Sequence, residues 1–438
     1  MHDPSPLQEA HHNAPLRLLV RAWPVFAGIM LVIGVLFLAT SDHPRIFPLR
    51  HIVLYQVEAW WYERVGAPQQ RGTGTLQGCV STADGRPAVA ATVLVAELEG
   101  TTHSTTTDTA GCYILPDLPA GSYVPVVGAT NGVDISVRPA VRVQPDQQQT
   151  RDIRLPPPTL PAVEPGRDLR LGAPITLAWP LPRPGSAVEQ SVQFDSGGQP
   201  NQTMFYYTPV DAAAPLPVLL IVYPGPAEAW KGVSIPLAAA GYAVVATGPA
   251  YSFDLEADLD ELQRVIQFVR AGAFPYADGR QLVLMGGSYS SLHVLAMLQR
   301  DVSFEGAVLL GPPTDLFALR RQLEAGTFAP PFGLDQALIA LGRPNTNPEP
   351  FWRYSARYHV RPDWPPLLLM HSRSDEVVPF EQSELLAAEL EAAGLPYEAT
   401  FFDGMSHYLL ADDASEQLDM LYTILLEFLA SVFNEPAP

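Results

Sequence analysis

Residues 282–291 read Leu-Val-Leu-Met-Gly-Gly-Ser-Tyr-Ser-Ser, an apolar run that ends in small residues around Ser288. A sharp turn from a strand into a helix needs small residues on both sides, because the backbone is strained and the helix packs closely on the sheet. Gly286 and Gly287 meet that need on one side, and Ser290 replaces the last glycine of the usual G-x-S-x-G pattern. The segment predicts an α/β fold with Ser288 as a nucleophile. An ordinary glycine-rich strand end is the alternative.

A serine nucleophile needs an imidazole that takes its proton and a carboxylate that orients the imidazole. In α/β-hydrolases these residues follow in the order Ser, Asp, His. Asp375 comes after a buried strand predicted at 366–370, and His407 comes after a strand predicted at 397–402. Because catalytic groups gather at the carboxyl ends of parallel strands, Asp375 is predicted to orient His407, the general base.

Position along the chain separates the competing histidines and carboxylates. Six of the ten histidines lie within the first 103 residues, away from these strands. His293, one turn into the helix after the nucleophile, and His371, at the end of a buried strand, are predicted to pack or to support neighbouring site residues. Glu376 and Asp403 are the other acidic candidates, but the loop position favours Asp375 as the orienting carboxylate.

Acyl transfer also needs backbone N–H groups that point at the developing oxyanion. Tyr289, the residue after the nucleophile, is expected to supply one. A strongly apolar strand predicted at 218–222 is followed by Tyr-Pro-Gly-Pro, and proline has no N–H to donate. Gly225 is therefore the expected second donor, and a plain Pro-Gly turn is the alternative.

Residues 188–433 resemble the catalytic domain of the prolyl oligopeptidase and acylaminoacyl peptidase family of serine hydrolases, with dienelactone hydrolases as close relatives. The residues at 223–226 are similar to the family's His-Gly-Gly-Pro, those at 286–291 to Gly-Gly-Ser-Tyr-Gly-Gly, and those at 375–379 to Asp-x-x-Val-Pro. The resemblance implies an α/β-hydrolase fold and cleavage of acyl bonds. It also implies the same base and the same two oxyanion donors.

The chain departs from that family pattern at three places. Tyr223-Pro224 stands for His-Gly, Ser290-Ser291 for Gly-Gly, and Ser372 for a glycine that often follows the strand histidine. These departures concern efficiency more than reaction class. They also motivate a hypothesis of another class, a surface binding protein whose hydrolase fold is inactive.

The N-terminal region is predicted to comprise a tail at 1–21, a transmembrane anchor at 22–41 and a juxtamembrane segment at 42–70. No residue of 22–41 is charged, and a helix of about 20 residues crosses a bilayer core. A cleaved signal peptide is the alternative. Arginines lie on both sides of the span, so charge does not set its orientation. Residues 46–65 are predicted to form a helix at the membrane interface or packed on the protein.

Residues 71–155 show short β runs separated by turns, which predicts a small antiparallel sandwich. The segments 78–85, 107–113 and 118–123 resemble a carboxypeptidase regulatory-like domain, with a transthyretin-like fold. Such domains usually act as spacers or interaction modules, so a cell-surface or protein partner is one expectation. Because of this domain, the sandwich and the hydrolase are expected to be extracytoplasmic.

Both cysteines of the chain, Cys79 and Cys112, lie within the predicted sandwich. A disulfide would suit an oxidising exterior. Two buried thiols are the alternative, since the sequence does not give the separation of the two residues.

A proline-rich linker is predicted at 156–187, in which residues 169–181 belong either to the linker or to an edge strand. The hydrolase domain is assigned to 188–438. Its segment 311–364 is rich in aromatic residues, which either line a substrate pocket or form the core of a helical insertion. The charged run 254–261 is interpreted as a solvated helix face.

The net charge of −20, with Lys231 as the single lysine, argues against nucleic acid as a partner. The sequence has no phosphate-binding loop, dinucleotide fingerprint or His-Glu-x-x-His motif, and it implies neither a metal nor an organic cofactor. A small peptide or ester substrate is expected. The family resemblance favours a peptidase. However, such peptidases usually carry a β-propeller and no propeller repeat is visible here, so an esterase stays open.

Overall fold

The computed structural model describes residues 28–35, 37, 72–129, 134–157, 163–180, 184–195, 204–248, 255–301, 303–328, 334–407 and 414–433. By internal contacts the chain divides into residues 1–67 and 68–438. The predicted tail, the juxtamembrane segment and most of the predicted anchor lie outside the described residues. Residues 28–35 and 37 are helical, and no helix within the described ranges is long and apolar enough to cross a membrane.

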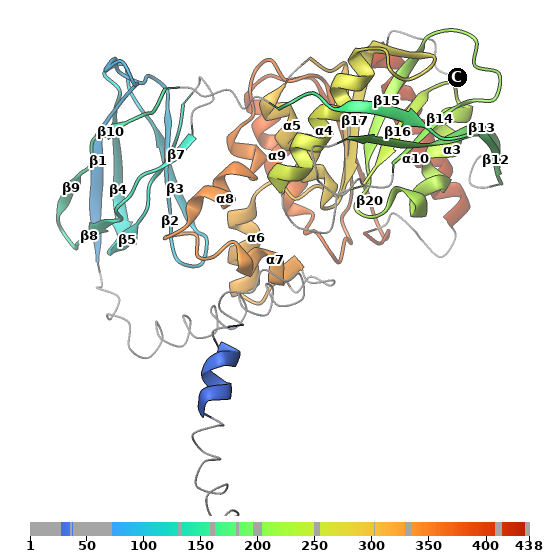
Figure 1. Ribbon diagram of the computed structural model, residues 1–438. Coiled ribbons are helices and arrows are strands. Elements are labelled where there is room, and N and C mark those ends of the chain that lie inside the picture. Colours follow the sequence, from blue (N-terminus) through green and yellow to red (C-terminus); the bar gives the residue numbers. More distant parts are fainter. Residues whose placement is uncertain are drawn as a thin grey trace, which may run out of the picture. The chain divides into compact units, whose positions relative to one another are not determined.

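The first domain is a β-sandwich (Figure 1). Its strands are β1 (Thr73–Ser81), β2 (Thr92–Ala96), β3 (Thr102–Thr106), β4 (Cys112–Pro119), β5 (Gly121–Tyr123), β6 (Val126–Gly128), β7 (Asp134–Ser136), β8 (Val141–Val143), β9 (Gln148–Thr150) and β10 (Ile153–Arg154). One sheet has the order β10-β1-β4 with β9 beside β1, another has the order β3-β2-β6-β7, and β5 pairs with β8. Alternate residues of β1, among them Leu76 and Val80, fill the core between them.

Two features of the sandwich differ from the prediction. Strands β9 and β10 both pair parallel with β1, so the first sheet is mixed and not wholly antiparallel. Strand β3, with the sequence Thr-His-Ser-Thr-Thr, was not predicted. It carries no apolar alternation because its side chains are half-buried or exposed, and its pairing with β2 holds it in place.

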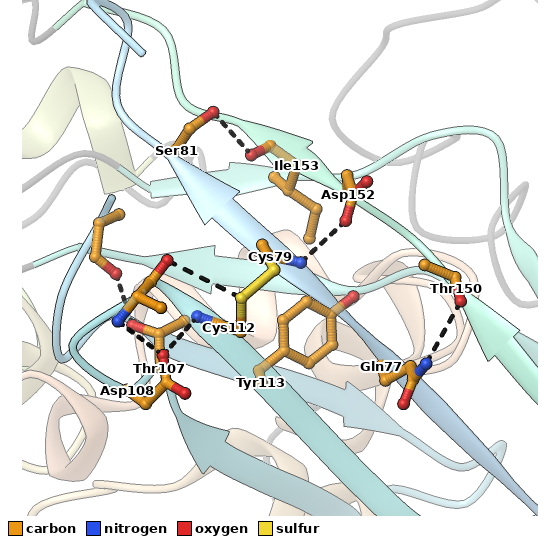
Figure 2. Close-up of a disulfide and its surroundings, with 12 residues drawn as sticks. Gln77, Cys79, Ser81, Thr107, Asp108, Cys112, Tyr113, Thr150, Asp152 and Ile153 are labelled. Carbon is orange, nitrogen blue, oxygen red and sulfur yellow. Dashed lines mark hydrogen bonds between the residues drawn. A yellow bond between two sulfur atoms is a disulfide. The ribbon is translucent and has the colours of Figure 1, made fainter. Parts of the chain in front are cut away.

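A disulfide joins Cys79 of β1 to Cys112 of β4, which the sequence had left open (Figure 2). The two residues are direct partners in the antiparallel ladder, so their backbones bring the sulfur atoms together. Aspartates hold both backbones there. The Cys79 N–H donates to Asp152 over 2.9 Å, and the Cys112 N–H donates to Asp108 over 2.8 Å.

The second domain is built on a ten-stranded sheet. Its strands are β11 (Arg167–Leu171), β12 (Ile175–Trp179), β13 (Gly185–Asp195), β14 (Met204–Pro209), β15 (Leu216–Val222), β16 (Ala243–Thr247), β17 (Ala277–Gly287), β18 (Gly306–Leu310), β19 (Leu367–Ser372) and β20 (Tyr397–Phe402). The order is β11-β13-β14-β16-β15-β17-β18-β19-β20, with β12 beside β13. The strands β16, β15, β17, β18, β19 and β20 run parallel to one another, whereas β11 to β14 pair antiparallel and β14 is also antiparallel to β16.

Helices cover both faces of this sheet, which confirms the predicted doubly wound α/β-hydrolase architecture (Figure 1). The helices are η1 (Ala227–Trp230), α3 (Lys231–Ala239), α4 (Leu255–Arg270), α5 (Ser290–Arg300), α6 (Leu316–Glu324), α7 (Leu334–Ala340), α8 (Pro348–Arg353), η2 (Ala356–Tyr358), α9 (Glu381–Ala392) and α10 (Ala414–Phe433). Residues of α3 and α10 pack on one face, and residues of α4, α5 and α9 pack on the other. Because both faces are covered, the central strands are continuous apolar runs.

Strands β11 and β12 form the edge of the large sheet, beside β13. The sheet therefore takes in residues from Arg167 onward, which lie within the predicted linker 156–187, and β11 and β12 include most of the stretch 169–181 for which an edge strand was the alternative. Their side chains are mostly exposed, as an edge strand allows, and that left them hard to distinguish from a linker in the sequence.

Between β18 and β19, the aromatic side chains form a core. Phe317 and Phe351 are fully buried and stack with ring centroids 5.4 Å apart, and Trp352 is 1% exposed. The same core cluster contains Leu94 and Val126 of the sandwich. These aromatic residues therefore pack within and between the domains and do not line an open pocket.

Candidate active site

Ser288 lies in the turn between β17 and α5 with a positive φ of 53°. This is the strained left-handed conformation that the small neighbours were predicted to permit. A backbone hydrogen bond ties the turn to the neighbouring strand: the Ser288 N–H donates to the carbonyl of Leu310, at the end of β18, over 2.7 Å. Gly286 allows the helix to approach: a Cβ there would lie 2.8 Å from both the Ser290 carbonyl and the Val294 side chain.

Ser290, which replaces the usual glycine, has a structural function in this turn. Its fully buried hydroxyl accepts a hydrogen bond from the Gly287 N–H at 3.0 Å. The same hydroxyl lies 2.5 Å from the carbonyl oxygen of Val222 and 2.8 Å from that of Gly287. The side chain therefore links the end of β15 to the turn, and its polar atom is satisfied in spite of burial.

Asp375 and His407 are brought together by the loops after β19 and β20. The Asp375 Oδ2 atom lies 2.7 Å from His407 Nδ1, and the two side chains are 1% and 5% exposed. A carboxylate only accepts, so Nδ1 carries the proton and Nε2 carries the lone pair of the neutral ring. The competing carboxylates lie elsewhere: Glu376 accepts from the His407 backbone N–H at 3.0 Å, and Asp403 is 88% exposed.

The Asp375 carboxylate is held by four donors. Oδ1 accepts from the N–H groups of Val377 and Val378, each at 2.8 Å, and Oδ2 accepts from His371 Nε2 at 3.1 Å as well as from His407. Burial opposes ionisation, but the hydrogen bonds from His371, His407 and Val378 outweigh it. The pKa of Asp375 is therefore well below its ordinary value.

Gly311 belongs to this site although the sequence reasoning did not single it out. It follows β18 with a φ of +52°, and a Cβ on it would lie 3.2 Å from Asp375 Oδ2 and 3.6 Å from His407 Cε1. Leu310, to which Ser288 is hydrogen-bonded, directly precedes it. The Ser288 turn is thus hydrogen-bonded to the residue before the glycine that faces the Asp–His pair. A glycine at the end of a buried strand was the only available signal.

The predicted oxyanion residues lie at the ends of two neighbouring strands. Gly225 follows β15, and within the described residues its N–H has no hydrogen-bond acceptor. Its carbonyl packs against Gly248, where a Cβ would approach to 2.0 Å. Tyr289 forms the N-cap of α5, and its ring meets that of His293 edge-on at 5.1 Å. Since β15 and β17 are adjacent, the two residues share one edge of the sheet.

The other departures from the family pattern also have structural partners. The Tyr223 ring is buried and stacks on Trp230 at 5.4 Å, and its hydroxyl lies 2.8 Å from the Ser234 hydroxyl. The Ser372 hydroxyl donates to the carbonyl of Met405 at 2.5 Å. Ser372 thereby ties the end of β19 to the loop that carries the candidate base.

The interpretation of residues 254–261 as a solvated helix face is wrong for two of its acidic residues. Asp258 and Glu261 are each only 6% exposed, and they line a cavity of about 10 Å³ together with His293. His293 Nε2 lies 3.1 Å from Asp258 Oδ2. The apolar residues of α4 pack on the sheet, and Asp258 and Glu261 lie next to them in the helix and are therefore buried as well. The number of charges in the segment does not predict this.

Each of the two folded domains contains a region that matches a known protein family. Residues 256–436 match the prolyl oligopeptidase family, and residues 75–156 match the carboxypeptidase regulatory-like domain. A curated relative, endo-1,4-beta-xylanase B of Butyrivibrio fibrisolvens, is 28% identical over 158 residues, which are 34% of this chain. The chain spans only 24% of the length of that relative.

Solved structures similar to this chain include esterase 2 of Thermogutta terrifontis. It shows 20% sequence identity and a TM-score of 0.42, over 52% of this chain and 90% of the esterase. Another is the acetyl ester-xyloside bifunctional hydrolase of Caldicellulosiruptor lactoaceticus, with 21% identity and a TM-score of 0.43, over 56% of this chain and 92% of that one.

The family match covers β17, β18, β19 and β20, whose carboxyl ends carry the elbow serine and the Asp–His pair described above. The chain therefore has an α/β-hydrolase fold in which residues 256–436 match the prolyl oligopeptidase family, and this region follows one that matches a carboxypeptidase regulatory-like domain.

Proposed function

We propose that Ser288, His407 and Asp375 are the catalytic triad of this hydrolase. The Ser288 hydroxyl attacks an acyl carbonyl while its proton passes to His407 Nε2. The N–H groups of Gly225 and Tyr289 bind the resulting oxyanion. His407 then gives the proton to the leaving group, and a water molecule, deprotonated by the same ring, hydrolyses the acyl-enzyme and restores the serine.

The contact between Asp375 and His407 carries this proposal. A hydrogen bond of 2.7 Å between two nearly buried groups fixes the imidazole tautomer that a general base requires. The positive φ of Ser288 supports the nucleophile role, because strained non-glycine residues cluster at active sites.

Labelling with a fluorophosphonate tests the triad. The parent protein is expected to react, and Ser288→Ala is expected to lose the label. In Ser288→Ala and His407→Ala, kcat should fall by on the order of 10⁶-fold, because the members of a triad act as a unit. A folded parent protein that does not react, or a Ser288→Ala variant that still does, would refute the assignment.

For the leaving group, we propose a peptide amine. The family match to prolyl oligopeptidases supports it. An amide is harder to cleave than an ester because its amine must be protonated as it leaves, which is the second task of His407. Turnover of matched aminoacyl amide and acyl ester chromogenic substrates separates the two. A preparation that cleaves only the esters would identify an esterase.

We also propose that residues 22–41 anchor the enzyme in a membrane, with both folded domains on the extracytoplasmic side. The uncharged apolar composition of 22–41 supports the anchor. The Cys79–Cys112 disulfide supports an oxidising compartment. Full-length protein that leaves the membrane fraction at alkaline pH would contradict the anchor. A protein partner of the sandwich stays a prediction.

A further inference from the structure

His371 is a second histidine in contact with Asp375, and it is fully buried. Its Nε2 atom lies 3.1 Å from Asp375 Oδ2 and 3.1 Å from the carbonyl oxygen of Val378. Its Nδ1 atom lies 2.7 Å from the hydroxyl of Ser383 on α9. Both ring nitrogens are therefore engaged, and the ring has no room to act as a base toward a substrate.

These partners determine where the proton of His371 resides. A carboxylate and a carbonyl are both acceptors, so Nε2 must carry the proton and donate it. Nδ1 of the neutral ring is then an acceptor, and the Ser383 hydroxyl is its donor. The Ser383 side chain is fully buried, so no water competes for this hydrogen bond. The strand β19 and the helix α9 together hold one tautomer.

The acceptor that His371 contacts on Asp375 is the same oxygen that contacts His407. Oδ2 receives Nε2–H of His371 at 3.1 Å and Nδ1–H of His407 at 2.7 Å. The other oxygen is occupied by backbone N–H groups. Rotation of the carboxylate would break several of these bonds at once.

We propose that His371 is a positioning residue of the triad, which holds Asp375 Oδ2 in line with His407 and limits how strongly the carboxylate attracts the proton of His407. This inference rests on the proposed function. The reason is electrostatic: a carboxylate oxygen that already accepts one hydrogen bond carries less charge for a second.

The other charged groups near Asp375 do not take this role. The Glu376 carboxylate accepts from the backbone of His407, and Asp403 is exposed beside Arg373. From β18 the facing residue is Gly311, which has no side chain. From α9 the contact is the neutral Ser383. Loss of the His371 donor therefore has no ready substitute.

The test compares His371→Leu with His371→Gln by the pH dependence of kcat/KM. Leucine removes the donor, so kcat/KM should fall about 10- to 100-fold, which is the value of a hydrogen bond to a charged group. The acidic limb of the profile should also move to higher pH by about one unit, because the Asp375 carboxylate then stabilises the protonated His407 ring more strongly. The glutamine amide can donate to Oδ2 and should restore the limb.

Two controls separate positioning from stability. His359→Leu removes a partly buried histidine whose Nδ1 lies 4.0 Å from Asp134, away from this loop, and should not move the acidic limb. Ser383→Ala leaves His371 in place but removes the donor that fixes its tautomer, and it should move the limb by less than His371→Leu. If His371→Leu does not fold, Ser383→Ala takes its place as the test variant.

Titration of the His407 ring by NMR provides a readout that needs no turnover. Its midpoint should move to higher pH in His371→Leu. The inference is overturned if His371→Leu leaves both the acidic limb and the NMR midpoint at the parent values. It is also overturned if His371→Gln behaves like His371→Leu, or if His359→Leu shifts the acidic limb by the same amount. Failure of the parent to react with the fluorophosphonate would refute the proposed function instead, and the NMR midpoint would still decide the role of His371.

Discussion

At two positions of the site, a serine stands in place of the glycine of the family pattern. Ser290 and Ser372 stand where the family pattern has glycine, and each hydroxyl hydrogen-bonds a carbonyl of a neighbouring strand end or loop. Both departures therefore have structural partners. They hold the turn after β17 and the loop after β20 in place.

Ser290→Ala should cost about 1–3 kcal/mol of unfolding free energy, because the partly buried Gly287 N–H loses its acceptor and the buried Val222 carbonyl loses the hydroxyl beside it. Thermal and denaturant unfolding measure this. Ser290→Gly restores the family residue and should be destabilised to a similar degree. A variant as stable as the parent would show that the hydroxyl contributes nothing.

Asp375 predicts a specific acid sensitivity. Because its pKa is lowered on folding, the ionised carboxylate stabilises the fold above the unfolded value of about 3.9, and this stabilisation is lost as the pH falls below it. Asp375→Asn should lower kcat by about 10⁴-fold. It should also show a weaker loss of stability below pH 4 than the parent. Parallel stability curves for the two proteins over acidic pH would contradict this.

At the scale of elements, the carboxyl ends of adjacent parallel strands assemble the site. Strand β17 supplies Ser288, β18 supplies Gly311, and β19 supplies His371 and leads to Asp375. The backbone bonds Ser288 N–H to Leu310 O and Gly311 N–H to Met370 O link these ends in sequence. The spacing of the side chains is thus set by the sheet ladder.

Gly311→Ala tests this arrangement. A Cβ would enter a left-handed conformation and lie 3.2 Å from Asp375 Oδ2, so strain of about 1–2 kcal/mol and a displaced carboxylate are expected. Such a displacement can reduce kcat/KM by about 100-fold. Gly326→Ala, also at positive φ but with nothing near its Cβ, is the matched control and should keep full activity. Equal activity of both variants would contradict the role of Gly311.

In the molecule as a whole, one of the apolar clusters of the second domain also contains Leu94, Ala96 and Val126 of the sandwich, which otherwise has a core of its own. Trp352 of α8 packs against Gly128 of β6, where a Cβ would approach the indole to 2.4 Å. His359 Nε2 hydrogen-bonds the Trp352 carbonyl at 2.8 Å and Nδ1 faces Asp134 of β7. The Val124 N–H donates to the carbonyl of Asn345. The sandwich is therefore docked on the insertion between β18 and β19.

Trp352→Ala should cost about 3–5 kcal/mol, the usual loss for a buried aromatic side chain. Calorimetry should show one unfolding transition in the parent and two in the variant, because the domains no longer unfold together. Trp179→Ala, at the half-exposed edge strand, should leave a single transition. Two transitions already present in the parent would show that the domains are not coupled.

The α/β architecture and the chain order of the proposed triad can be predicted from local patterns in the sequence. Apolar runs that end in Ser288, Asp375 and His407 predict parallel strands, and in such a sheet their carboxyl ends meet at one edge. The turn residues at 286–291 likewise predict a strained elbow, because local sterics alone require small residues there.

Contacts between residues far apart in the sequence could not be predicted in this way. The disulfide, the parallel pairing of β9 and β10 with β1, the second hydrogen bond to Asp375 and the docking of Trp352 all join segments with no common local pattern. The strand β3 and the buried carboxylates of α4 show the same point. Periodicity reports which face of an element is apolar, whereas a partner from elsewhere in the chain decides what that face meets.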